Sequence, residues 1–171
     1  MQIPHRPFVS VIIPVFNDNE RLSLCLTALD RQSYPRDAYE VIVIDNNSSE
    51  DVSAVVDNFE QAKVIYETQP GSYIARNRGL KIVQGEVIAF TDADCIPDPI
   101  WLQEGVETLK SEPGVGLVAG HIELFVQDPE KPNPFELYEK IALAFPQDQF
   151  LLNDHFGVTA NLFTFKQVID A

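Results

Sequence analysis

The stretch EVIAFTDADCIPD, residues 86–98, begins as an apolar segment and ends in acidic residues. Residues 86–91 are rich in β-branched and aromatic side chains, which indicates a short buried strand. Asp92 and Asp94 follow at once, with one small residue between them. Two carboxylates so close together repel each other unless something positive lies beside them. The stretch therefore predicts a strand whose end needs a positive group.

The composition of the chain limits the classes of partner. It has 171 residues, 45% of them apolar, which suits one domain with one hydrophobic core. The formal net charge of −14 argues against nucleic acid or an anionic membrane surface as general partners, because both need a basic face. Two distant cysteines, Cys25 and Cys95, favour reduced thiols and a cytoplasmic setting. We expect no membrane segment in this chain, since its longest mainly apolar run, residues 8–16, is too short; a longer parent protein could still be peripheral to a membrane.

Strand-like and helix-like segments alternate along most of the chain. Runs rich in β-branched residues predict strands over 8–15, 40–45, 63–66, 86–91 and 115–119. Apolar stripes at helical spacing between them predict helices, with Asn17 expected to cap the first and Ser72 the third. This alternation predicts an α/β fold, with a mostly parallel sheet and helices on both faces. Beyond Gly120 the alternation weakens, and we expect a helix over 135–145 and a late strand over 157–165.

Polar clusters follow the carboxyl ends of four predicted strands. They are PVFN at 14–17, Asp45 with the turn NNSSED, the segment 71–79, and Asp92 to Asp94. In a parallel sheet these strand ends meet at one edge, and α/β proteins bind their ligands there. We therefore expect the four clusters to line a single site.

The pair Asp92 and Asp94 allows more than one interpretation. An isolated pair of this kind is most often a solvated turn in which an aspartate caps the next helix. A calcium loop is excluded, because Pro97 stands where that loop needs glycine and Gln103 where it needs its closing glutamate. The functional interpretation is Mg²⁺ or Mn²⁺ held by one or two carboxylates and completed by phosphate oxygens. Such an ion would let an acidic protein hold a diphosphate.

Other residues near the same edge also have a structural and a functional interpretation. Arg76 and Arg78 could be exposed partners of the abundant acids, which contributes little, or could form an anion site with a helix N-terminus. Asp45 could simply open an Asx-turn, or it could accept hydrogen bonds from a base or a ribose. Trp101 is expected to be a packing anchor rather than a platform for a sugar.

Taken in order, these motifs resemble the nucleotide-sugar-binding half of the inverting glycosyltransferases of family 2, which have the GT-A fold. The matching segments run over residues 8–102: VSVIIPVFNDNERLSLCLTAL, QSYP, EVIVIDNNSSED, PGSYIARNRGL and GEVIAFTDADCIPDPIWL. A weaker match, HFGVTANLFTFKQVI at 155–169, resembles the stretch of the family that faces the acceptor. Each motif alone is weak, but five in family order are highly specific.

The resemblance implies which residues contact the donor nucleotide. Pro14, Phe16 and Asn17 would line the nucleotide pocket. Asp45 would contact the base or the ribose, and Arg76 the base or the phosphate side. The donor would be a nucleotide-diphosphate sugar of the UDP or GDP type, and the acceptor a hydroxyl of a glycan, lipid or protein, as in the synthesis of cell-envelope polysaccharides.

The resemblance also implies a divalent metal, Mn²⁺ or Mg²⁺, and transfer with inversion. Asp94 would be the main metal ligand, while Asp92 would lie near the ribose or donor sugar and could share the metal. The family often has two aspartates after the second strand, where this chain has Asp45 followed by Asn46. The resemblance therefore assigns no role to Asn46.

The catalytic base is the part of the family pattern that this sequence does not supply. In the family it is an acidic residue of a Glu-Asp-type motif that follows the segment matching GVTANLFTF. The sequence ends before such a motif, and Asp154 and Asp170 lack its context. We therefore expect residues 1–171 to be a C-terminally incomplete glycosyltransferase domain, whose base lies beyond Ala171. Its parts would be a donor-binding part, 8–102, and the start of an acceptor-side part, 115–171.

Two other functions stay open. A sugar nucleotidyltransferase also uses an α/β nucleotide-binding sheet and a metal, but it usually has a glycine-rich, basic loop where this chain has FNDNER. A non-catalytic module could have kept the nucleotide-sugar pocket alone. Release of pyrophosphate would indicate the first, and tight donor binding without hydrolysis the second.

Overall fold

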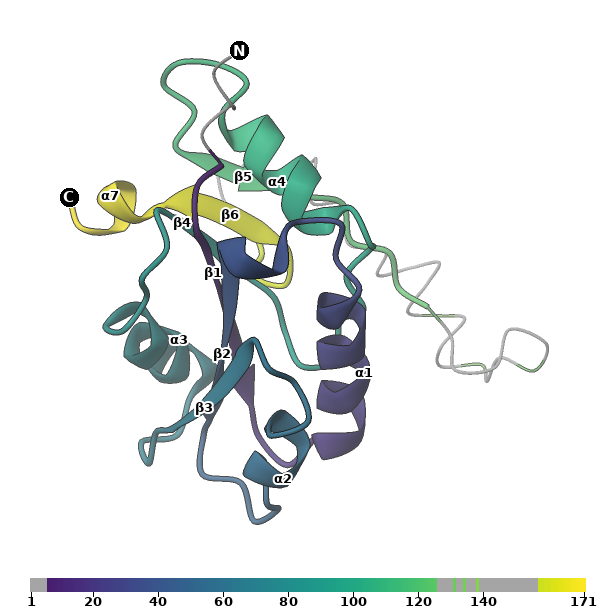
Figure 1. Cartoon of the computed structure of the whole chain (residues 1–171). Coiled ribbons are helices and arrows are strands. Elements are labelled where there is room, and N and C mark those ends of the chain that lie inside the picture. The colour runs from purple at the N-terminus through teal and green to yellow at the C-terminus, as the bar shows by residue number, and fades with distance from the viewer. Residues whose placement is uncertain (1–5, 126–130, 132–133, 135–137, 139–156) are drawn as a thin grey trace.

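The computed structural model describes residues 6–125 and 157–171, with 131, 134 and 138 between them. Six strands form one sheet in the order β3-β2-β1-β4-β6-β5 (Figure 1). The strands are β1 (Val9–Val15), β2 (Tyr39–Asp45), β3 (Ala62–Tyr66), β4 (Val87–Phe90), β5 (Leu117–Ala119) and β6 (Leu162–Phe165). The helices are α1 (Asn19–Asp30), α2 (Ser53–Val56), α3 (Ser72–Leu80), α4 (Trp101–Leu109) and α7 (Lys166–Ile169), with a 3₁₀ turn at Arg36–Ala38. None of the helices in these described ranges is long and apolar enough to cross a bilayer.

The sheet is mostly parallel, which confirms the predicted α/β class. β1 pairs in parallel with β2 and β4, and β2 pairs in parallel with β3. The exception is β6, which is antiparallel to both of its neighbours, β4 and β5. β5 consequently runs in the same direction as β1 to β4, so these strands all end at one edge of the sheet. We call this the carboxyl edge and the opposite one the amino edge.

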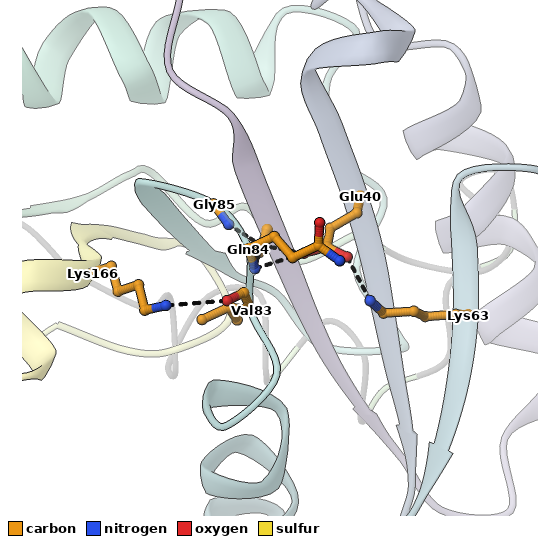
Figure 2. Close-up of polar contacts among 7 residues, drawn as sticks. Glu40, Lys63, Val83, Gln84, Gly85 and Lys166 are labelled. Atoms are coloured by element: carbon orange, nitrogen blue, oxygen red, sulfur yellow. Dashed lines mark hydrogen bonds and ion pairs between the residues drawn. The ribbon is translucent and has the colours of Figure 1, made fainter.

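The reversed direction of β6 decides where the end of the described chain lies. Leu162 is opposite Phe90 and Phe165 is opposite Val87, so β6 starts at the carboxyl edge and ends at the amino edge. Just past it, Lys166 donates from its Nζ to the carbonyl oxygen of Val83 at 3.2 Å (Figure 2). Helix α7 and the residues after it therefore lie at the amino edge.

Helices cover both faces of the sheet, as expected. α1, α2 and α4 pack on one face and α3 on the other (Figure 1). Alternate residues of β1 divide accordingly, with Val11 and Ile13 facing α1 and Ile12 facing α3. The expected packing role of Trp101 is confirmed by its contact with Phe163, since the centroids of the two rings lie 4.8 Å apart.

Two of the predicted helix caps are wrong. α1 begins at Asn19, and Asn17 instead has a φ of 50° and accepts hydrogen bonds from Ser49. The Asn17 side chain therefore joins the loop after β1 to the loop after β2 and does not cap α1. Ser72 is the first residue of α3 rather than its cap, and Gly71, with a φ of 131°, precedes it. Apart from residue 138, the predicted helix over 135–145 lies outside the described residues. The late strand, expected over 157–165, is limited to Leu162–Phe165.

A polar network at the amino edge fixes the loop that leads into β4. The carboxylate of Glu40 accepts hydrogen bonds from Ser10 Oγ at 2.7 Å and from the backbone N–H of Gln84 at 2.9 Å. Its other oxygen pairs with Lys63 Nζ at 2.6 Å (Figure 2). Ser10 Oγ also accepts a hydrogen bond from the backbone N–H of Gly85 at 2.9 Å. β4 therefore enters the sheet from a loop tied to β1 and β2.

Replacing Glu40 by glutamine should lower the free energy of unfolding by about 1–2 kcal/mol at neutral pH, and by less in acid. Burial raises the pKa of Glu40, but the hydrogen bonds from Lys63, Ser10 and Gln84 together lower it below its ordinary value. A carboxyl whose pKa is lowered in the folded state stabilises above its unfolded pKa, about 4.3, and loses that contribution as the pH falls through the folded value. Urea denaturation at neutral pH and at several values below 4.3 measures the difference; an equal cost at all of them would contradict the expectation.

Candidate functional site

The loops after β1 and β2 are tied together at the carboxyl edge. The backbone N–H of Asn17 donates to Ser48 Oγ at 3.0 Å, and the N–H of Ser49 donates to Asn17 Oδ1 at 2.7 Å. Asp45, the last residue of β2, accepts a hydrogen bond on Oδ1 from the N–H of Ser48 at 2.8 Å. Asp45 is only 4% exposed, so the turn after β2 holds its carboxylate in one place. The turn therefore fixes two of the predicted site residues relative to each other.

Pro14 and Phe16 lie at the same edge but differ in what they offer. Pro14 is buried within β1 and stands opposite Ile44 in the parallel register. It therefore belongs to the sheet and supports the carboxyl edge without being exposed there. Phe16 is 61% exposed and presents an aromatic ring at the surface, where a planar group could stack.

Asp92 has a positively charged partner, which offsets the repulsion between its carboxylate and that of Asp94. Arg76, on α3, forms an ion pair from Nη2 to Oδ1 of Asp92. Only 13% of the Arg76 side chain and 31% of that of Asp92 are exposed, so water screens this pair less than a surface pair. The Nε of Arg76 is buried and has no hydrogen-bond partner among the described residues. Arg78, by contrast, is exposed.

Asp94 is more open than Asp92. It is 53% exposed, and its nearest positive group is Arg21 of α1, whose Nη1 lies 3.8 Å from Asp94 Oδ2. Arg21 is held by Asp18 through Nη2–Oδ2 and Nε–Oδ1 distances of 2.6 and 3.0 Å. An exposed pair at this distance contributes less than about 1 kcal/mol. The Asp94 carboxylate is thus accessible to a ligand at small cost.

The donor set at Asp92 and Asp94 fits a hard divalent cation that shares its shell with a ligand. In the described ranges no three His, Cys, Asp or Glu side chains lie close enough to enclose a metal ion. Mg²⁺ characteristically binds through one or two carboxylates together with water and substrate phosphates, and carboxylates suit Mn²⁺ as well. Burial raises the pKa of the Cys95 thiol, which disfavours its thiolate form. The chemistry present is that of oxygen ligands.

A hollow of about 210 Å³ lies beside Asp45, between the ends of β2 and β3. Its acidic lining residues are Asp45, Glu50, Asp51 and Glu67. Among its lining residues, all of which the structure describes, none is basic. The hollow can accept hydrogen bonds but repels phosphate. The positively charged Arg76 lies on the other side of Asp45, where it pairs with Asp92 after β4.

The contacts of two residues at this edge were not predicted from the sequence. Asn46 is 7% exposed and hydrogen-bonded to the segment before α3, whereas the sequence pattern assigned it no role. Arg21 was missed because it reads as an ordinary exposed helix residue. Its spacing of three from Asp18 was the one available signal, and that spacing indicates a local pair rather than a contact with Asp94.

Comparison with known proteins identifies the family. The model for "Glycosyl transferase family 2" matches residues 10–170. The glycosyltransferase AglE of Haloferax volcanii is 37% identical over 169 residues, which cover 96% of this chain and 54% of AglE. A dolichyl N-acetyl-alpha-D-glucosaminyl phosphate 3-beta-D-2,3-diacetamido-2,3-dideoxy-beta-D-glucuronosyltransferase of Methanococcus voltae is 30% identical over 125 residues, which cover 67% of this chain and 39% of that enzyme. The chain thus spans about half the length of AglE, at 54%, and less of the second relative.

Solved structures share the fold. The mannosyltransferase PcManGT from Pyrobaculum calidifontis, in complex with GDP-Man and Mn²⁺, has a TM-score of 0.72 at 24% identity, covering 98% of this chain and 47% of that one. S. aureus TarS 1–349 in complex with UDP has a TM-score of 0.73 at 20% identity, covering 95% of this chain and 48% of that one. These likenesses establish the GT-A fold. The match to the family model over residues 10–170 shows that this chain belongs to glycosyl transferase family 2.

Proposed function

We propose that this chain binds a nucleotide-diphosphate sugar at the carboxyl edge and serves metal-dependent transfer of the sugar, with inversion, to an acceptor hydroxyl. The observation that carries the proposal is the arrangement of Asp45, Arg76, Asp92 and Asp94 around one edge of a family 2 domain. The edge combines hydrogen-bond acceptors for a nucleoside, an arginine and an accessible carboxylate. A binding site for a nucleoside diphosphate needs these groups.

The nucleoside would lie over the ends of β1 and β2. Asp45 already uses Oδ1 for the N–H of Ser48, so its other oxygen would accept a hydrogen bond from the base or the ribose. Phe16 offers an exposed ring for stacking, with Asn17 in the loop beside it and Pro14 in the end of β1 below. Related structures were solved with GDP-Man, UDP and UDP-GlcNAc, which supports a donor of the GDP or UDP type here.

The diphosphate would lie between Arg76 and Asp94. Arg76, whose buried Nε has no partner among the described residues, would donate to the base or to the phosphate side. Asp94, with Asp92 beside it, would hold Mn²⁺ or Mg²⁺. The metal, when bound, supplies positive charge where the leaving diphosphate becomes more negative. PcManGT was solved with Mn²⁺, which supports a divalent metal here.

The acceptor would approach from the side of β6. This strand starts at the carboxyl edge, where the side chain of Asn161 donates to the carbonyl oxygen of His121 at 2.8 Å, so these two residues lie at the same edge of the sheet as the proposed donor site. A carboxylate must take the proton of the acceptor hydroxyl. Asp170 is not suited to that role, because it follows α7 at the amino edge. Asp154 lies outside the described residues.

Titration calorimetry with GDP and UDP, each with and without Mn²⁺, tests the proposal. We expect one of the two to bind at least about tenfold more tightly with Mn²⁺, because the metal offsets the repulsion between a diphosphate and an acidic protein. Lack of binding by both in the presence of Mn²⁺ or Mg²⁺ would contradict the proposal. Sugar transfer or hydrolysis of a donor would separate a transferase from a binding module. Release of pyrophosphate from a nucleoside triphosphate and a sugar phosphate would instead indicate a nucleotidyltransferase.

A further inference from the structure

Asn46 uses its whole side-chain amide to hold the segment 67–71, which connects β3 to α3. Its Nδ2 donates to the carbonyl oxygens of Glu67 at 3.2 Å and Gln69 at 2.6 Å. Its Oδ1 accepts a hydrogen bond from the backbone N–H of Gly71 at 2.7 Å. Since Asn46 follows the last residue of β2 and is 7% exposed, these bonds fasten the segment to the sheet away from water.

The position of Gly71 decides where α3 begins. Gly71 has a φ of 131°, a conformation that favours glycine, and it directly precedes the first residue of the helix. Its carbonyl oxygen accepts hydrogen bonds from the N–H groups of Ile74 and Ala75, both at 3.0 Å. Arg76 is the next residue of the same helix and pairs with Asp92. A continuous set of contacts therefore leads from Asn46 through Gly71 and α3 to Asp92.

We propose that Asn46 is a positioning residue of the donor site: by fixing Gly71 to the end of β2, it places Arg76 against Asp92 and the diphosphate. The inference rests on the proposed function and deepens it. It also gives a physical reason for asparagine at this position. An ionised aspartate has the same shape but no N–H, so it would leave two carbonyl oxygens without their donor and place a negative charge beside them.

The test compares Asn46→Asp with Asn47→Asp. Asn47 is the next residue, is exposed and has a φ of 70°, which aspartate also tolerates. The two variants add the same charge at adjacent positions, but only the first loses the bonds to 67–71. With Mn²⁺ present, Asn46→Asp should weaken binding of GDP or UDP by at least about tenfold, and Asn47→Asp by no more than about threefold. Equal weakening by both would overturn the inference, because charge alone would then explain the loss.

A double-mutant cycle with Arg76→Gln tests whether Asn46 acts through Arg76. If it does, Asn46→Asp should weaken binding by less than about twofold once Arg76 is replaced, since the effects of coupled residues do not add. Additive losses would overturn the inference. Asn46→Ala, which removes the bonds without adding charge, should behave like Asn46→Asp.

Hydrogen exchange provides a readout that does not depend on a nucleotide. Backbone amides in residues 71–76 should exchange faster in Asn46→Asp and Asn46→Ala than in Asn47→Asp, while those of β1 stay protected. Unchanged exchange in 71–76 would contradict the positioning role, whether or not a nucleotide binds. Lack of nucleotide binding by the parent chain would instead contradict the proposed function. Loss of cooperative folding in both Asn46 variants would also overturn it, because Asn46 would then serve the whole fold and not Arg76.

Discussion

Replacement of Asp94 by asparagine is expected to weaken Mn²⁺ binding, and with it metal-dependent binding of a nucleoside diphosphate, by about 100-fold or more, or ~2.7 kcal/mol. The reason lies in how the two acids are used. Asp92 is paired with Arg76, whereas Asp94 is 53% exposed and has Arg21 only at 3.8 Å. Asp94 is therefore the carboxylate free to take a metal. An amide oxygen carries no charge and binds a hard cation far less strongly than a carboxylate does.

Electron paramagnetic resonance of free Mn²⁺, with no nucleotide added, measures the loss at Asp94 directly. Asp98→Asn is the matched control: it makes the same change in the same loop, and its side-chain oxygen can still accept the hydrogen bond that Asp98 takes from the N–H of Ile100. We expect the Asp98 variant to bind Mn²⁺ within about twofold of the parent chain. Parent-like Mn²⁺ affinity in Asp94→Asn would rule out Asp94 as the main ligand.

The meeting of the acids and Arg76 at one edge could be predicted from the sequence because it follows from topology. Apolar runs that end in Asp45 and in Asp92 read as buried strands, and parallel strands end at the same edge. No knowledge of side-chain contacts is needed for that step. It does not say which arginine pairs with which acid, since the pair joins Arg76 and Asp92 across different elements.

The predictions that failed relied on local rules where a distant group took over. Asn17 has the residue type and spacing of a helix cap, but the N–H of Ser49, from the loop after β2, takes its side-chain oxygen instead. The direction of β6 could not be predicted at all. An apolar run such as Leu162–Phe165 has the same sequence pattern whether the strand is parallel or antiparallel.

Asn46 shows why a buried polar residue is hard to interpret from sequence alone. Next to Asp45 it reads as a turn residue, and nothing in the pattern distinguishes it from the exposed Asn47 that follows. Its three bonds go to backbone atoms of a segment that no side-chain motif marks. Such a role becomes visible only when the path of the backbone is known.

Replacement of Gly85 by alanine is the structural change with the largest expected cost, about 3 kcal/mol or more in the free energy of unfolding. A Cβ at this position would lie 2.5 Å from Ser10 N, 2.7 Å from Val87 O and 2.8 Å from Phe8 O. All three are backbone atoms where β1 and β4 meet, so no side chain can turn aside to make room. The start of β4 would have to move away from β1, which also displaces Asp92 and Asp94 at its far end.

Gly116→Ala is the control for Gly85→Ala, because its added Cβ would meet only the methyl groups of Val168, at 3.6 and 3.8 Å. We expect that variant to stay within about 0.5 kcal/mol of the parent chain in urea denaturation. Mn²⁺ binding distinguishes a loss of stability from a displacement of the site. Even under conditions where it is folded, the Gly85 variant should bind the ion more weakly, since β4, which leads into both acids, is displaced. A Gly85 variant as stable as the Gly116 variant would mean that β1 and β4 approach each other less closely than the structure has them.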